Sequence, residues 1–234
     1  MIVSRVDRVA LRRAVSAVVL LTAGLGLAAC SDEAPAPAPS PSVVWPDGPP
    51  SGPFESDPWV QAVREAETAL AVAVNANDFG SAALNTRRTY FGVQGIALEA
   101  EARLATNSAF VYLGPRPFEP VAVVPAAEGG KVSVAGCAGE VSLMEQRPSG
   151  LPRTFSPVMT YTLEMDEDGE RRIVAVDAGE VPFTLPTGEL LTEELCQGVD
   201  VKSGRFEPAP DLAALVESGL DGLVPPPSPS ATSP

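Results

Sequence analysis

The strongest hydrophobic pattern in this chain is helical and begins just after Asp57. Apolar side chains recur there at intervals of four, three, four and four residues, at Trp59, Val63, Ala66, Leu70 and Val74. This spacing places them along one stripe of an amphipathic helix. Asp57 suits the N-cap and Pro58 the first helical position, and the polar run at residues 75–78 ends the stripe. The pattern therefore predicts a long helix that begins at Pro58.

Three further segments also favour helices. Residues 81–88 predict a short second helix. Residues 96–105 alternate apolar and charged side chains as a strand would, but they are strong helix formers and Glu99 and Arg103 make an i,i+4 pair, so we predict a helix. Residues 211–223 predict a last amphipathic helix, whose apolar side carries Leu212, Leu215, Val216, Leu220 and Leu223.

Strand patterns dominate the chain after the first three helices. Short apolar runs at residues 110–113 and 121–124 precede a strand at residues 131–137, and residues 159–165 and 172–176 predict a hairpin around an Asp-Gly turn. Helices followed by four to six antiparallel strands predict an α+β fold. We expect N-terminal helices packed on a curved antiparallel sheet.

The first residues of the chain have the features of a bacterial export signal. Four arginines precede an uncharged apolar stretch at residues 14–29, which is short for a membrane-spanning helix. The sequence Leu27-Ala28-Ala29-Cys30 resembles the bacterial lipobox. This resemblance implies cleavage between Ala29 and Cys30 and attachment of a diacylglycerol to Cys30, whereas an ordinary signal peptide or an anchor helix is the alternative. The general and twin-arginine export routes both stay open.

Proline-rich segments divide the rest of the chain into domains. Residues 31–57 contain eight prolines and few apolar groups, so we expect residues 30–57 to form the lipidated cysteine and an extended linker. Residues 58–205 form the predicted globular α+β domain. Residues 206–234 are expected to hold a short helix and a disordered Pro/Ser-rich tail.

Composition and charge exclude several classes of function. The 234 residues include 16 Lys plus Arg, 30 Asp plus Glu and no His, which gives a net charge of -14. The absence of histidine excludes Ser-His-Asp catalysis and His-bearing zinc sites, and the acidity argues against nucleic-acid binding. Removing residues 1–29 takes away four arginines and one aspartate, which leaves 12 basic and 29 acidic residues. Such a chain is repelled by anionic headgroups, so a lipid would have to hold it at the membrane.

Two cysteines remain besides Cys30. Because an exported protein folds under oxidising conditions, we predict a disulfide between Cys137 and Cys196; two buried thiols are the alternative. No metal-binding spacing surrounds either cysteine, and we expect no metal and no cofactor. The disulfide would place residues 137–196 within one folded unit.

The order of the elements over residues 58–180 resembles the nuclear-transport-factor-like cone, a group that includes the SnoaL-like cyclases. The resemblance rests on the long helix that closes at Asn77-Asp78-Phe79, the short second helix, the strand at residues 132–137 and the hairpin that ends at residues 172–176. The Ala/Pro/Val-rich composition is similar to that of actinobacterial lipoproteins that carry such domains. Enzymes with this fold would need an Asp, His or Tyr in the cavity, and this chain has no His.

Aromatic side chains are candidates for a pocket between helix and sheet. These are Trp59, Tyr90, Tyr112 and Tyr161, although such side chains more often belong to the core. The basic pairs at residues 87–88 and 171–172 are interpreted as solvated. We expect a lipid-anchored, extracytoplasmic, non-enzymatic domain of the cell envelope that binds a small apolar ligand or an envelope protein. The alternatives are a carboxylate-dependent isomerase or hydrolase and a structural envelope lipoprotein.

Overall fold

The computed structural model describes residues 41–126, 129–147 and 156–228, and these residues form the predicted α+β fold. The cleavage site and Cys30 lie outside the described residues. Among the residues that the structure does describe, no helix combines the length and apolar composition that a membrane span requires. The curvature expected for a cone stays a prediction.

The predicted long helix is present as α1 (Pro58–Ala76). The Asp57 side chain accepts a hydrogen bond of 2.7 Å from the backbone N–H of Trp59, and Pro58 occupies the first turn, where its missing N–H costs nothing. Asn77 ends the helix in the left-handed conformation, with φ of 54°. Asparagine tolerates this conformation better than most residues do. Both ends of α1 therefore lie where capping chemistry places them.

The other predicted helices differ from expectation mainly at their ends. Helix α2 (Ala82–Arg87) is capped by Ser81, whereas α3 (Tyr90–Ala105) begins six residues before the predicted start. Gly92 and Gly95, which weaken helix propensity, concealed that first part. The predicted last helix is divided into α5 (Leu212–Ser218) and a 3₁₀ turn (Leu220–Gly222), because Gly219 has a positive φ of 53° that interrupts the helix.

The main sheet has four antiparallel strands in the order β3 (Phe118–Pro125), β4 (Lys131–Ala138), β6 (Val158–Met165) and β7 (Arg171–Asp177). The last two strands form the predicted hairpin. In its turn, the Asp166 carboxylate accepts hydrogen bonds from the backbone N–H groups of Asp168 and Glu170, and Gly169 has a φ of 82°. The Asp-Gly pattern that predicted the hairpin is thus the feature that forms its turn.

Among the described residues, three short strands and one short helix were not predicted, whereas the strand predicted at residues 110–113 is present in a small sheet. Strand β1 (Ser42–Val44) pairs with β8 (Arg205–Glu207), and β2 (Phe110–Tyr112) pairs with β5 (Leu143–Glu145). Helix α4 (Glu193–Gln197) is capped by Thr192. Strand β1 lies inside the range that its prolines predict to be a linker, and there the structure differs from that prediction. A three-residue strand is too short to show periodicity, and its partner is distant in sequence.

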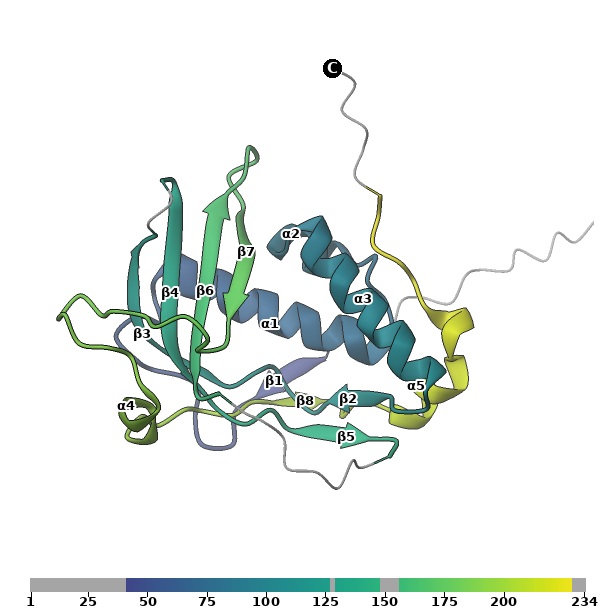
Figure 1. The fold of residues 1–234 in the computed structure, drawn as a ribbon. Helices are drawn as coiled ribbons and strands as arrows, with labels where there is room; N and C mark the ends of the chain where they lie inside the picture. Colours follow the sequence, from purple (N-terminus) through teal and green to yellow (C-terminus); the bar gives the residue numbers. More distant parts are fainter. Residues whose placement is uncertain (1–40, 127–128, 148–155, 229–234) are drawn as a thin grey trace, which may run out of the picture. The chain divides into compact units, whose positions relative to one another are not determined.

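Helix α1 lies against the main sheet along its first half and against α3 and β2 along its second half (Figure 1), and each half carries its own group of buried side chains. The first half of the helix lies against the sheet, where Val60, Val63 and Ala66 contact side chains of β3, β4 and β6. The second half lies against α3 and β2, where Val74 belongs to a cluster with Phe110 and with side chains of α2 and α3. Helix α1 is therefore shared between two packing environments.

The predicted disulfide joins Cys137 of β4 to Cys196 of α4, with the two Cα atoms 5.3 Å apart. Both cysteines are buried, and they form a cluster with Ala135, Val158 and Leu191. The bond therefore attaches the segment after β7 to β4, an inner strand of the sheet.

Candidate functional site

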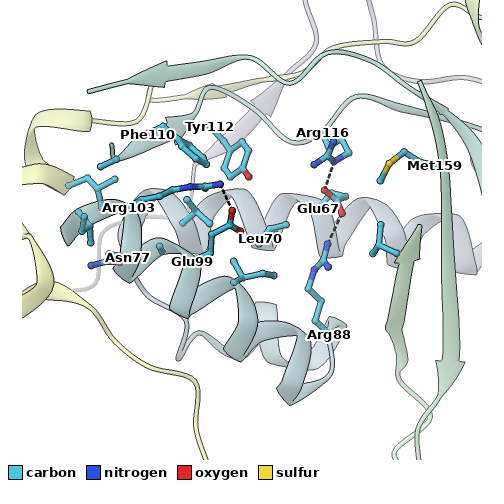
Figure 2. A pocket seen from close by; sticks show the side chains of 17 residues that line it. Glu67, Leu70, Asn77, Arg88, Glu99, Arg103, Phe110, Tyr112, Arg116 and Met159 are labelled. Atoms are coloured by element: carbon cyan, nitrogen blue, oxygen red, sulfur yellow. Dashed lines mark hydrogen bonds and ion pairs between the residues drawn. The ribbon is translucent and has the colours of Figure 1, made fainter. Parts of the chain in front are cut away.

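A cavity of about 240 Å³ lies between the second half of α1, helix α3 and strand β2 (Figure 2). We call it the α1–α3 cavity. Helix α1 lines it with Glu67, Leu70, Val74 and Asn77, which are three, four and three residues apart and so lie on one helix face. The volume is below the ~300–1,000 Å³ of cavities that hold drug-sized ligands. A ligand of this cavity would therefore be small.

Most of the lining is apolar. Apart from α1, the apolar side chains come from α3, β2, β6, β7 and α5; among them are Ile96, Ala100, Leu104, Phe110, Met159, Val176 and Leu215. The polar side chains are concentrated in a few places. The cavity thus has the usual character of a small-molecule site, an apolar chamber with few convergent polar groups.

A buried ion cluster forms one end of the cavity, as Figure 2 shows. The Glu67 carboxylate, with the residue 6% exposed, has its Oε1 2.6 Å from Nη2 of Arg88 and its Oε2 3.5 Å from Nε of Arg116. Arg88 directly follows α2, and Arg116 lies between β2 and β3. We call these three residues the Glu67 cluster. Three elements that are far apart in sequence thus place one carboxylate between two guanidinium groups.

The Glu67 cluster has a net positive charge, because its single carboxylate contacts two guanidinium groups. Burial lowers the pKa of Arg116, but the Glu67 carboxylate opposes this effect, and the net pKa lies above the ordinary arginine value. Among the described residues, Nε of the 7% exposed Arg88 has no hydrogen-bond partner. Because charges interact strongly where water is scarce, the surplus positive charge favours an anion in the cavity.

Tyr161 lies in the core next to this cluster. It is fully buried, and within the described residues its hydroxyl has no hydrogen-bond partner. Burial raises the pKa of this phenol well above its ordinary value; Glu67 raises it further, while Arg116 and Arg88 oppose the rise. Tyr161 therefore keeps its proton at neutral pH and is suited to donate a hydrogen bond, not to act as a base.

A second ion pair lies on the more exposed side of the cavity. Glu99 and Arg103, four residues apart on α3, contact each other with side chains that are 59% and 34% exposed. The guanidinium of Arg103 also lies over the ring of Phe110, with 4.2 Å between its Cζ and the ring centroid. This pair is solvated, so it shields the cavity without adding much stability.

Strand β2 is attached to α1 by the side chain of Asn75. This amide accepts a hydrogen bond of 2.7 Å from the backbone N–H of Tyr112 and donates one of 2.8 Å to the carbonyl oxygen of the same residue. Burial raises the pKa of the Tyr112 phenol, which Arg116 and Arg103 partly oppose. The two hydrogen bonds fix Tyr112, and with it this wall of the cavity.

The structure brings only one of the four aromatic pocket candidates to the α1–α3 cavity, namely Tyr112. Tyr161 belongs to the core cluster between α1 and the sheet, and Trp59 is half-buried with Arg171 over its ring at 5.1 Å. Tyr90 begins α3, where it contacts the exposed Phe91. The four side chains therefore do not form one site.

The residues of the Glu67 cluster were missed by sequence reasoning. The interpretation of Arg88 as solvated is wrong, because it is buried against Glu67; its neighbour Arg87 forms ion pairs of 2.6 Å with Glu65 and with Glu170. One feature of the sequence could have indicated Glu67. It lies four residues after Val63 and three before Leu70, so it is a charged residue on an apolar helix face.

A second hollow, of about 620 Å³, also borders the Glu67 cluster. We call it the α1–α2 hollow; Arg64, Ala69, Ala83 and Thr86 are among the residues that line it, and it shares Glu67 and Arg116 with the α1–α3 cavity. Within the described ranges no three His, Cys, Asp or Glu side chains are placed to hold a metal ion. Two guanidinium groups beside one carboxylate make anion binding the chemistry that the α1–α3 cavity offers most directly.

Comparisons with known proteins add little to this description. No family model matches the chain, and no curated protein matches it. Among solved structures, the intermembrane space region of the chloroplast protein ARC6 is similar at 11% identity, with a TM-score of 0.31, over 50% of this chain and 90% of that one.

Proposed function

We propose that this protein is a lipid-anchored, extracytoplasmic binding domain of the bacterial cell envelope and that the α1–α3 cavity holds a small organic anion with an apolar body. The sequence Leu27-Ala28-Ala29-Cys30 supports the anchor, and the apolar lining supports a ligand with a hydrocarbon part. The cone resemblance is compatible with this role, since that fold encloses a cavity between helix and sheet.

One observation carries the anion assignment. Glu67 compensates only one of the two arginines that contact it, although the whole chain carries a net charge of -14. Placing a positive charge in a buried site costs several kcal/mol unless it is paired. Arg116 is the residue best suited to contact the ligand, because its side chain is 29% exposed and its contact with Glu67 is the longer one.

The same geometry favours binding over carboxylate catalysis. A general acid or base needs a carboxyl group that can exchange a proton with the substrate. In this cavity Glu67 is held between two arginines, and Glu99 is paired with Arg103.

The binding proposal can be tested with an eight-carbon carboxylate. Calorimetric titration of the domain from residue 41 onward with octanoate is expected to show binding, whereas octylamine, with the same chain and opposite charge, is expected not to bind. The variant Arg116→Gln should weaken octanoate binding about tenfold or more, because charged hydrogen bonds contribute roughly 1.5–3 kcal/mol. Equal binding of octanoate and octylamine would contradict the proposal.

A matched pair of alanine variants identifies which hollow is used. Ala100→Phe places a ring in the α1–α3 cavity, while Ala69→Phe places the same ring in the α1–α2 hollow. We expect Ala100→Phe to abolish octanoate binding and Ala69→Phe to leave it intact. The reverse result would move the site to the α1–α2 hollow.

The anchor is tested separately. A Cys30→Ser variant of the full chain should lose partitioning into detergent and the mass of the lipid. Retention of both properties would contradict lipidation at Cys30.

The bound anion itself can be identified by a separate experiment, native mass spectrometry of the mature protein purified from membranes.

A further inference from the structure

A second buried polar atom lies at the opposite end of the α1–α3 cavity from the Glu67 cluster. Asn77 is 1% exposed and lines the cavity where α1 ends. Its Nδ2 donates a hydrogen bond of 3.1 Å to the carbonyl oxygen of Gly219. Its Oδ1 has no hydrogen-bond partner among the described residues.

The orientation of this amide follows from its partner. Reversing the two ends of the side chain would place Oδ1 against the carbonyl oxygen of Gly219, where two acceptors repel each other. Oδ1 is therefore the atom left over. A buried acceptor without a donor is unfavourable, because it has lost its hydrogen bonds to water without replacement, and such atoms are therefore rare in folded proteins.

The space between the two polar ends is apolar. Glu67 and Asn77 are ten residues apart on one helix face, which corresponds to about 15 Å along the axis. Leu70 and Val74 lie between them on α1, and Ile96, Ala100 and Phe110 line the cavity from α3 and β2. In Figure 2, Asn77 and the Glu67 cluster lie at opposite ends of this lining.

We infer that the ligand is an extended amphipathic anion with a hydrogen-bond donor at the end away from its anionic group, and that Asn77 accepts that hydrogen bond. ω-Hydroxy carboxylic acids are the simplest compounds of this class. The inference rests on the proposed function, because it assumes that the anionic end lies at Arg116 and Arg88. Asn77 is then a specificity residue that distinguishes a ligand with a terminal donor from a plain fatty acid.

The test compares octanoate with 8-hydroxyoctanoate, and with the six- and ten-carbon ω-hydroxy acids, by calorimetric titration. The terminal hydroxyl makes water contacts in solution that a hydrocarbon pocket would not replace, so without Asn77 it should weaken binding. With Asn77 as acceptor, the best-fitting hydroxy acid is expected to bind about tenfold more tightly than the plain acid of the same length.

The variant Asn77→Gly removes the amide and keeps a residue that accepts the positive φ. It is expected to reverse the preference, so that the plain acid binds more tightly. Asn107→Gly is the matched control, because Asn107 has a φ of 53° and is exposed; it should keep the wild-type preference.

The outcomes separate the two proposals. If neither acid binds, the proposed function fails. If octanoate binds but no hydroxy acid binds more tightly than its plain counterpart, the inference about Asn77 is overturned and the proposed function stands. The wild-type comparison decides this point even if Asn77→Gly does not fold.

Discussion

The two halves of α1 have the same periodicity and different surroundings. In the first half, Val60 and Val63 are no more than 1% exposed and lie against the side chains of the sheet. In the second half the same face carries Glu67 and Asn77, and a cavity replaces the close packing. A single amphipathic stripe therefore stabilises the fold at one end and forms a site at the other. The difference comes from two polar residues on a face that is otherwise apolar.

The comparison explains why the buried charge is informative. Apolar side chains at positions 67, 88 and 116 together would avoid the desolvation cost that Glu67, Arg88 and Arg116 incur, since buried ion pairs replaced as a whole by apolar side chains often cause no loss of stability. The first half of α1 shows that the helix packs well on apolar contacts alone. The proposed ligand would give these ionic groups a role that stability alone does not give them.

The largest effect is expected from Glu67→Gln. This change leaves Arg88 buried without a counter-charge, and removing one partner of a buried ion pair costs about 3–5 kcal/mol. The free energy of unfolding from urea titration should fall by that amount. Glu99→Gln, at the exposed pair on α3, is the matched control and should change it by less than about 0.5 kcal/mol. Similar effects for the two variants would refute the distinction between a buried and a solvated pair.

Two identical truncations compare the core and the cavity directly. Leu163→Ala removes a fully buried side chain under the sheet and is expected to cost about 2–5 kcal/mol. Leu70→Ala removes the same atoms from a half-buried position that already borders a cavity, so it should cost about 1 kcal/mol. If Leu70→Ala is as destabilising as Leu163→Ala in urea titrations, the second half of α1 is ordinary core.

The disulfide between Cys137 and Cys196 lies at the main sheet and not at the α1–α3 cavity. Replacing both Cys137 and Cys196 by alanine should lower the free energy of unfolding by about 2–4 kcal/mol, because the unfolded chain then has more conformations. Neither cysteine lines the α1–α3 cavity. Octanoate affinity measured well below the unfolding temperature should therefore stay unchanged. A parallel loss of affinity would show that the two environments are coupled.

A smaller effect is expected at alkaline pH. Burial raises the pKa of Tyr161 well above its ordinary value, so the folded protein keeps this proton at a pH where the unfolded chain loses it. The unfolded state then binds fewer protons, and stability falls as the pH rises above the unfolded pKa of about 10. When the pH is raised from 8 to 11, the free energy of unfolding of Tyr161→Phe should fall by about 1.4 kcal/mol less than that of the wild type. Parallel pH profiles of unfolding for the two proteins would contradict this assignment.

Much of the fold could be predicted because its local chemistry is strong. Asp57, Pro58 and Asn77 define α1, and the turn from Asp166 to Gly169 defines the hairpin. Of the three-residue strands, β2 has an apolar run that predicted it, whereas β1, β5 and β8 could not be predicted, because they are too short to show periodicity and their pairing depends on residues distant in sequence.

The site was much less predictable than the fold. Glu67 and Asn77 could have been found as polar residues on an apolar helix face, but Arg88 and Arg116 lie in connecting segments without periodicity. Only tertiary structure brings them to one carboxylate. The aromatic candidates do not lie together, because aromatic side chains also pack in a core; Tyr161 is an example.

The central claim is that the Glu67 cluster binds the anionic end of a small ligand inside the α1–α3 cavity. The most direct measurement is a crystal structure of the domain with octanoate. We expect the carboxylate within hydrogen-bond distance of Arg116, with the alkyl chain along Leu70 toward Phe110. A structure in which the carboxylate points to solvent, or in which octanoate occupies the α1–α2 hollow instead, would contradict the claim.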